Sequence, residues 1–161
     1  MKDLLDKAQQ LHILLKDITK HDNNSLWMPN LCGACALSAL VVYKIAKSLG
    51  YEALLDLNHS FKNGTHCWTI VNGKIIDCTA TQFSELKDLI KEGILIADTQ
   101  EVYRSVMLED GDFYNDPSYE NDFLYLTSCG GDPEDEFGTI SMFNKYKDII
   151  NKTLNMNLEL E

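Results

Sequence analysis

The sequence has little proline and no long apolar run. It contains only three prolines among 161 residues, and 45% of its residues are hydrophobic, a composition typical of a folded domain rather than a disordered chain. No stretch reaches the roughly 18 apolar residues of a membrane span. The charged residues 1–7 do not have the form of a secretory signal. We therefore expect a single domain over residues 1–161, with no membrane partner.

Basic residues are missing from one long segment. Residues 105–138 contain ten acidic residues and no Lys or Arg, and this segment accounts for nearly all of the net charge of −11. A nucleic-acid partner is not expected, because binding to phosphates requires a basic face. We expect a solvated surface loop, with attraction of a basic protein substrate as the alternative. A calcium loop is not expected, since the central Gly and closing Glu are missing.

Cysteines are few and odd in number: Cys32, Cys35, Cys67, Cys78 and Cys129. This count, with no signal sequence, favours a reducing cytoplasm over a disulfide scaffold. Cys32 and Cys35 lie where a loop leads into an apolar helix, expected from about residue 33 or 34 to Leu49. A thiol at a helix start is close to the positive end of the helix dipole, which favours thiolate. Thiolate is the form that attacks carbonyl carbon or binds metal.

A hairpin follows this helix. Asn72-Gly73 separates the β-rich residues 65–71 and 74–79, and Asn-Gly between two such runs predicts a two-residue turn. The turn pairs Val71 with Lys74, which makes His66 and Asp77 diagonal neighbours on one face of the hairpin. A slip of one residue would separate them. Cys67 and Cys78 are expected on the opposite face, in the core.

The other elements are predicted from hydrophobic periodicity. Helices are expected over residues 2–19, 83–91 and 140–154, the last closing the domain, and strands over residues 52–58, 94–97, 101–108 and 124–127. His12 and His21 are expected to be ordinary surface or boundary histidines. The predicted fold is α+β, with a central helix that bears Cys35 packed against an antiparallel sheet.

A thiol at a helix start, a strand histidine and an acid on the adjacent strand are the groups that nucleophilic acyl chemistry requires. The histidine takes the thiol proton, and the carboxylate fixes the orientation and tautomer of the imidazole. Backbone N–H groups at the helix start are available to hold an oxyanion. The sequence thus predicts a catalytic site made of Cys35, His66 and Asp77.

Three motifs carry a resemblance to a known family. Gly33-Ala34-Cys35, His66-Cys67-Trp68 and Asp77-Cys78-Thr79, in this order and at short spacing, resemble the transglutaminase-like branch of the papain-like cysteine enzymes. The resemblance covers residues 30–83. It implies a papain-like core, Cys35 as nucleophile, His66 as general base and acid, and Asp77 as orienting carboxylate, with no cofactor and no metal.

The chain departs from the family pattern at two places. Pro29 stands six residues before the nucleophile, where papain-type enzymes carry an oxyanion-hole Gln, so a side-chain donor is expected from Asn30 or Trp27. Cys78 stands where transglutaminase-like proteins commonly have Pro. Trp68 is expected to form part of the core or of the site wall.

The expected function is amide hydrolysis through a Cys35 thioester, as a protease or protein-glutamine deamidase acting on a protein or peptide, and transfer to an amine is equally compatible. One alternative is a thiol–disulfide oxidoreductase using Cys32-x-x-Cys35, which would attack with Cys32. A zinc site made of Cys32, Cys35, His66 and Cys67 is disfavoured, since adjacent strand residues point to opposite faces. A catalytically silent binding module of the same fold is the remaining alternative.

Overall fold

The computed structural model describes residues 1–22, 27–61, 64–107 and 138–160. Its helices are α1 (Lys2–His21), α2 (Cys35–Ser48) and α4 (Thr139–Leu154), and its strands are β1 (Ala53–Phe61), β2 (Gly64–Val71), β3 (Lys74–Asp77), β4 (Ile90–Lys91) and β5 (Ile94–Ala97). Three short 3₁₀ helices, η1 (Ala80–Gln82), η2 (Ser84–Leu89) and η3 (Gln100–Tyr103), complete the described elements.

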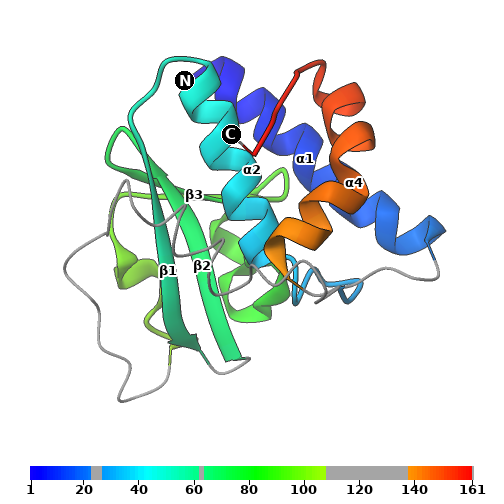
Figure 1. Cartoon of the computed structure of the whole chain (residues 1–161). Helices are drawn as coiled ribbons and strands as arrows, with labels where there is room; N and C mark the ends of the chain where they lie inside the picture. Colours follow the sequence, from blue (N-terminus) through cyan, green and yellow to red (C-terminus); the bar gives the residue numbers. More distant parts are fainter. Residues whose placement is uncertain (23–26, 62–63, 108–137, 161) are drawn as a thin grey trace.

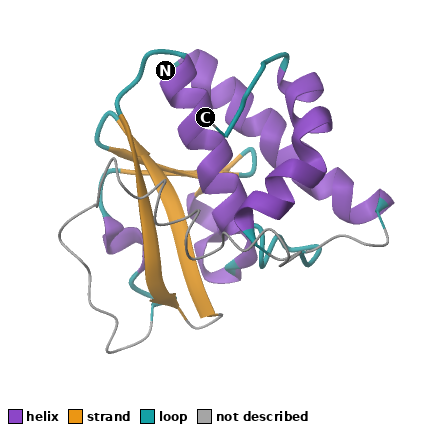
Figure 2. Cartoon of the chain, in the orientation of Figure 1, coloured by secondary structure: helices purple, strands orange, loops and turns teal. Residues whose placement is uncertain are grey.

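The strands form one antiparallel sheet in the order β1-β2-β3-β5-β4. Helix α2 lies between this sheet and the pair α1 and α4 (Figure 1). The helices therefore cover one face of the sheet, and the 3₁₀ segments pack on the other face with a second, smaller apolar cluster. The layered arrangement of helices and strands is visible in Figure 2. The predicted mixture of helices with an antiparallel sheet is confirmed.

The β2–β3 hairpin has the predicted register. Asn72 and Gly73 both have positive φ, 50° and 79°, as a two-residue turn of this type requires. Val71 pairs with Lys74 and Ile70 with Ile75. The turn chemistry thus sets which side chains of β2 and β3 share a face, and it brings His66 and Asp77 together.

Helix α2 is the central element of the core. Its apolar positions, Leu37, Leu40, Val41 and Ile45, are fully buried, and Gly50 follows its C-terminus with a φ of 84°, a left-handed conformation that favours glycine. The Thr69 hydroxyl of β2 donates to the carbonyl of Ala39 at 2.7 Å. This bond helps to fix the position of α2 relative to β2, and thereby the position of Cys35.

Three predictions differ from the structure. The strand expected over residues 101–108 is wrong: Gln100–Tyr103 is a 3₁₀ helix, and Tyr103, Val106 and Met107 are buried at the three- and four-residue steps of a turn rather than the two-residue step of a strand. The helix expected over 83–91 is a 3₁₀ helix that ends at Leu89 and is followed by β4. His12 is buried rather than at the surface.

Two predicted helices and one predicted strand agree with the structure. The helices expected over 2–19 and 140–154, and the strand over 94–97, are confirmed. Most of the acidic segment, the strand expected at 124–127 and Cys129 lie outside the described residues. Within the described part of the chain, no helix has the length and apolar content needed to cross a membrane.

Candidate active site

Cys35 is the first residue of α2 and is half-buried. The turns that precede it are tight: Leu31 and Gly33 have φ values of 72° and 98°, and the Met28 N–H donates to the Cys32 carbonyl at 3.0 Å. No side chain caps the start of the helix. The first N–H groups of a helix have no acceptor within the helix itself, and those of α2 lie in the same turn as the Cys35 thiol.

His66 and Asp77 form a buried ion pair. His66 Nε2 lies 2.7 Å from Asp77 Oδ2, and the two residues are 1% and 2% exposed. Burial disfavours a charged imidazole, but the charge and hydrogen bond of Asp77, with those of Cys35, prevail and raise the pKa of His66 to about 9. Burial likewise opposes the charge on Asp77, yet the His66 charge and the surrounding donors lower the pKa of this carboxyl.

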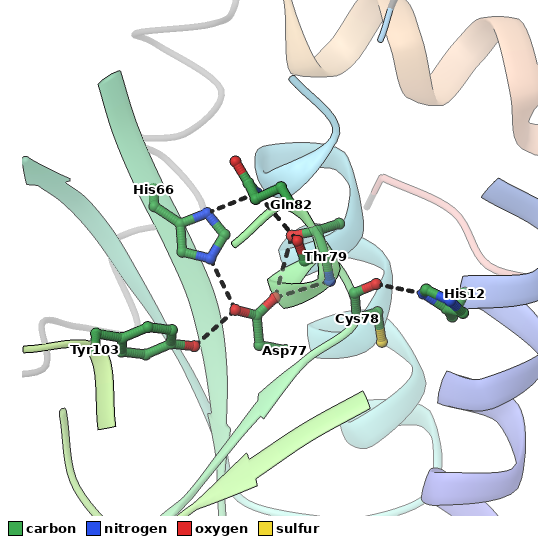
Figure 3. A network of polar contacts seen from close by, with 7 residues as sticks. All are labelled: His12, His66, Asp77, Cys78, Thr79, Gln82 and Tyr103. Atoms are coloured by element: carbon green, nitrogen blue, oxygen red, sulfur yellow. Dashed lines mark hydrogen bonds and ion pairs between the residues drawn. The ribbon is translucent and has the colours of Figure 1, made fainter. Parts of the chain in front are cut away.

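The Asp77 carboxylate accepts four hydrogen bonds, two at each oxygen (Figure 3). Oδ2 accepts from His66 Nε2 and from the Tyr103 hydroxyl, both at 2.7 Å. Oδ1 accepts from the Thr79 N–H at 2.9 Å and from the Thr79 hydroxyl at 3.1 Å. A buried carboxylate with this many donors is held ionised and in one orientation, and it therefore fixes the His66 ring.

Aromatic rings surround the His66 imidazole. The ring centroids of Phe61, Phe83 and Tyr103 lie 5.1, 4.9 and 5.8 Å from that of His66. Trp68 lies 5.9 Å away and stacks on Tyr103 at 4.3 Å. Trp68 is therefore buried beside the histidine. These rings exclude water from the pair and restrict rotation of the imidazole.

Cys35 interacts with two neighbouring residues of β2. A hydrogen bond from the Cys67 thiol, and then the hydrogen bond and charge of His66, hold the pKa of Cys35 well below its usual range, against the effect of burial. Cys67 has the opposite shift: its hydrogen bond to Cys35 and its burial raise its pKa, so it remains a thiol that donates to the Cys35 thiolate.

His66 and Cys67 are adjacent on β2 and were expected to point to opposite faces of the sheet, but both interact with Cys35. Asp56 of β1 pairs with Trp68, and His59 pairs with His66, so that two residues of β1 oppose Cys67 alone. The sheet is therefore irregular at the position of Cys67, where regular alternation of side chains between the two faces does not have to hold.

Gln82 of η1 also contacts His66. Its Nε2 lies 3.2 Å from His66 Nδ1 and 3.1 Å from the Thr79 carbonyl. Sequence reasoning missed Gln82, Tyr103 and the contact of Cys67 with Cys35. Gln82 follows Asp77 by five residues and lies directly after β3, so its nearness to Asp77 in the sequence is a signal for its position. No local pattern indicates the position of Tyr103.

Trp27 and Asn30, the two expected oxyanion donors, make hydrogen bonds outside the site. The expectation for Trp27 is wrong: this side chain is buried, and its indole N–H donates to the Leu15 carbonyl at 3.2 Å. Asn30 is exposed, and its side-chain oxygen accepts the Cys32 N–H at 3.0 Å. Asn30 therefore shapes the loop before α2.

Among the described cysteines, Cys32, Cys35, Cys67 and Cys78 form no disulfide. Within the described ranges, no group of three or more His, Cys, Asp or Glu side chains is arranged to hold a metal ion. Cys78 belongs to the core together with Cys67, as expected. Its carbonyl contacts His12 Nδ1 at 2.8 Å.

Comparison with known proteins gives no relative: no protein-family model, curated protein or solved structure matches the chain. The resemblance to transglutaminase-like enzymes therefore rests on the three motifs and on nothing else.

Proposed function

We propose that this chain is a cysteine-dependent acyl-transfer enzyme that hydrolyses amides of proteins or peptides. Cys35 is the nucleophile, His66 carries the proton and Asp77 orients the imidazole. The observation that carries the proposal is the buried 2.7 Å contact between His66 Nε2 and Asp77 Oδ2, together with the hydrogen bond between His66 and Cys35 at the start of α2.

The two ring nitrogens of His66 have different roles. Nε2 is occupied by Asp77, which leaves Nδ1 to serve Cys35. In this arrangement Nδ1 takes the thiol proton, and the resulting imidazolium is stabilised by the Asp77 carboxylate. The lowered pKa of Cys35 and the raised pKa of His66 support a thiolate–imidazolium pair at neutral pH.

The reaction then follows from these positions. The Cys35 thiolate attacks the amide carbon, a C–S bond forms, and the electron pair of the C=O bond moves to oxygen. Nδ1–H of His66 protonates the leaving nitrogen as the C–N bond breaks, which gives an amine or ammonia and a thioester. Nδ1 next takes a proton from water, the hydroxide oxygen attacks the thioester, and the acid leaves as Cys35 is regenerated.

The thioester chemistry is the same for a backbone peptide bond and a glutamine side chain. The family resemblance supports both a protease and a protein-glutamine deamidase, and the mass of the product distinguishes them. The redox alternative would use Cys32 as the attacking thiol, whereas the contacts with His66 and Cys67 belong to Cys35.

The test uses reduced β-casein, an unfolded protein rich in amides, incubated with the protein and analysed by peptide mass spectrometry. We expect either new peptide termini or conversion of glutamine to glutamate. The product is lost in Cys35→Ser, falls by about 10²–10⁴-fold in His66→Ala, and persists in the matched control Cys32→Ser. No change with the wild-type protein, or a product that persists in Cys35→Ser, contradicts the proposal. Loss of the product in Cys32→Ser alone would place the nucleophile at Cys32 and would also contradict the proposal.

A further inference from the structure

Gln82 lies on the nitrogen of His66 that must serve Cys35. Gln82 Nε2 is 3.2 Å from Nδ1 of His66 and 3.1 Å from the carbonyl oxygen of Thr79 (Figure 3). The side chain is half-buried, and it comes from η1, directly after the strand that carries Asp77. Three side chains, those of Asp77, Cys35 and Gln82, therefore contact the same imidazole.

The contact with Thr79 fixes which end of the Gln82 amide faces His66. A carbonyl oxygen only accepts hydrogen bonds, so the amide atom beside it is the nitrogen. This nitrogen has two N–H groups. One donates to Thr79, and the second is directed at Nδ1, which accepts it. This contact requires a neutral ring whose proton is on Nε2 and is donated to Asp77, which is the state of His66 before it takes the proton of Cys35.

This second hydrogen bond cannot persist through the reaction. Once Nδ1 has taken the proton of Cys35 it is itself a donor, and two donors then face each other at 3.2 Å. His66 is only 1% exposed, so Nδ1 cannot turn out to solvent to avoid the clash. The N–H of Gln82 has to leave Nδ1, while the bond to Thr79 keeps the amide next to the ring.

The displaced N–H stays next to the ring nitrogen that serves Cys35, and it has no acceptor there until negative charge develops on the carbonyl oxygen that Cys35 attacks. We propose that Gln82 supplies the side-chain donor of the oxyanion hole, through the N–H that rests on His66 Nδ1 only while the ring is neutral. This inference rests on the proposed function. The role was expected of Asn30 or Trp27, but the Trp27 N–H donates to the Leu15 carbonyl, and the Asn30 oxygen accepts from the Cys32 N–H.

The experiment compares two reactions of Cys35. Alkylation by iodoacetamide is a displacement at a saturated carbon and forms no oxyanion. Acylation by p-nitrophenyl acetate passes through a tetrahedral oxyanion: the thiolate forms a bond to the acetyl carbon, and p-nitrophenolate leaves with the electron pair. A donor that acts on the oxyanion affects only the acylation, whereas a residue that merely orients His66 affects both rates.

The variants are Gln82→Ala and Gln82→Met, the second of which keeps the side-chain volume without the amide. Gln100→Ala is the matched control, because Gln100 is also half-buried and its Nε2 also donates to a site beyond its own segment, the Asp56 carboxylate at 2.9 Å. We expect both Gln82 variants to lower the acylation rate about 100-fold, with alkylation within about threefold of wild type and Gln100→Ala close to wild type in both reactions.

Equal losses in acylation and alkylation would overturn the inference and leave Gln82 as a positioning residue for His66. Unchanged acylation in both variants would also overturn it. Failure of the proposed function gives a different result: the wild-type protein itself would show no acetyl adduct on Cys35, and its alkylation would be no faster than that of an ordinary thiol.

Discussion

Asp77→Asn changes one group at the centre of the site. All four partners of the carboxylate are donors in the structure: His66 Nε2 and the Tyr103 hydroxyl at Oδ2, and the N–H and hydroxyl of Thr79 at Oδ1. An asparagine amide has one accepting oxygen and one donating NH₂. The backbone N–H of Thr79 cannot reverse its role, whereas an imidazole can change tautomer. The oxygen of Asn will therefore face Thr79, and its NH₂ will face His66.

This orientation reverses the tautomer of His66. Nε2 must then accept, so the ring proton moves to Nδ1, where it can no longer take the proton of Cys35. We expect acyl transfer by Asp77→Asn to fall by about 10⁴-fold, the loss associated with a wrong tautomer in a catalytic triad. The ¹⁵N chemical shifts of the His66 ring report the tautomer directly, and Asp56→Asn is the control, because Asp56 is also 2% exposed in the same sheet.

The pH dependence provides a second measure of the same change. The pKa of His66 is about 9 in the folded protein and about 6.5 when unperturbed. The contacts of the protonated ring with Asp77 and Cys35 together therefore stabilise the fold fully below pH 6.5, by about 3 kcal/mol, and this contribution is lost as the pH rises through 9. In Asp77→Asn only burial and Cys35 act on the ring, so the pKa of His66 falls.

Urea denaturation at several pH values measures this difference. The gap in unfolding free energy between wild type and Asp77→Asn should be largest below pH 6.5 and should shrink above pH 9. Acyl transfer by the wild type should also decline above pH 9, where Nδ1 has no proton for the leaving nitrogen. A variant that keeps its activity within tenfold, or that keeps the proton on Nε2, would refute the reasoning.

Other predictions concern the elements around the site. Tyr103→Phe removes a hydroxyl from the buried carboxylate of the site and should lower the unfolding free energy by about 1.5–3 kcal/mol, as measured by urea denaturation. The Tyr146 hydroxyl donates to the half-exposed carboxylate of Asp22, so Tyr146→Phe should lower the unfolding free energy by less than Tyr103→Phe. Equal losses of unfolding free energy in the two variants would contradict the reasoning. Gly93→Ala places a Cβ 2.0 Å from the His12 ring, whereas Gly50→Ala, at the same φ of +84°, meets nothing within 4 Å. Gly50→Ala should lower the unfolding free energy by about 1–2 kcal/mol, and Gly93→Ala should lower it distinctly more. In a His12→Ala background the two glycine substitutions should have similar effects. A larger loss for Gly93→Ala that persists in this background would exclude the clash with His12 as its cause.

The sequence predicts the part of the site that depends on local rules. The Asn72-Gly73 turn fixes the strand register, and the register brings His66 to Asp77. Leu37 and the other apolar positions of α2 predict its buried face, and the helix start predicts the position of Cys35. These are consequences of backbone geometry over short stretches, for which turn chemistry and periodicity are sufficient.

The remaining contacts depend on tertiary packing. Tyr103 reaches Asp77 from a segment 26 positions away in the sequence, and its β-rich surroundings predicted a strand rather than the 3₁₀ helix that delivers it. His12 is buried because α1 lies against the turn at Gly93 and the Cys78 carbonyl. Gln82 reaches His66 because η1 folds back after Asp77. Neither periodicity nor turn chemistry specifies such contacts.

The central claim is that Cys35, and not Cys32, is an activated thiolate. Site-resolved mass spectrometry of iodoacetamide labelling at pH 6 tests it in one sample, because Cys32 lies three residues away, is also half-buried and serves as an internal reference. We predict that Cys35 is labelled much faster than Cys32, and that this advantage is lost in His66→Ala. Labelling of Cys35 at or below the rate of Cys32, or an advantage that survives in His66→Ala, would contradict the account.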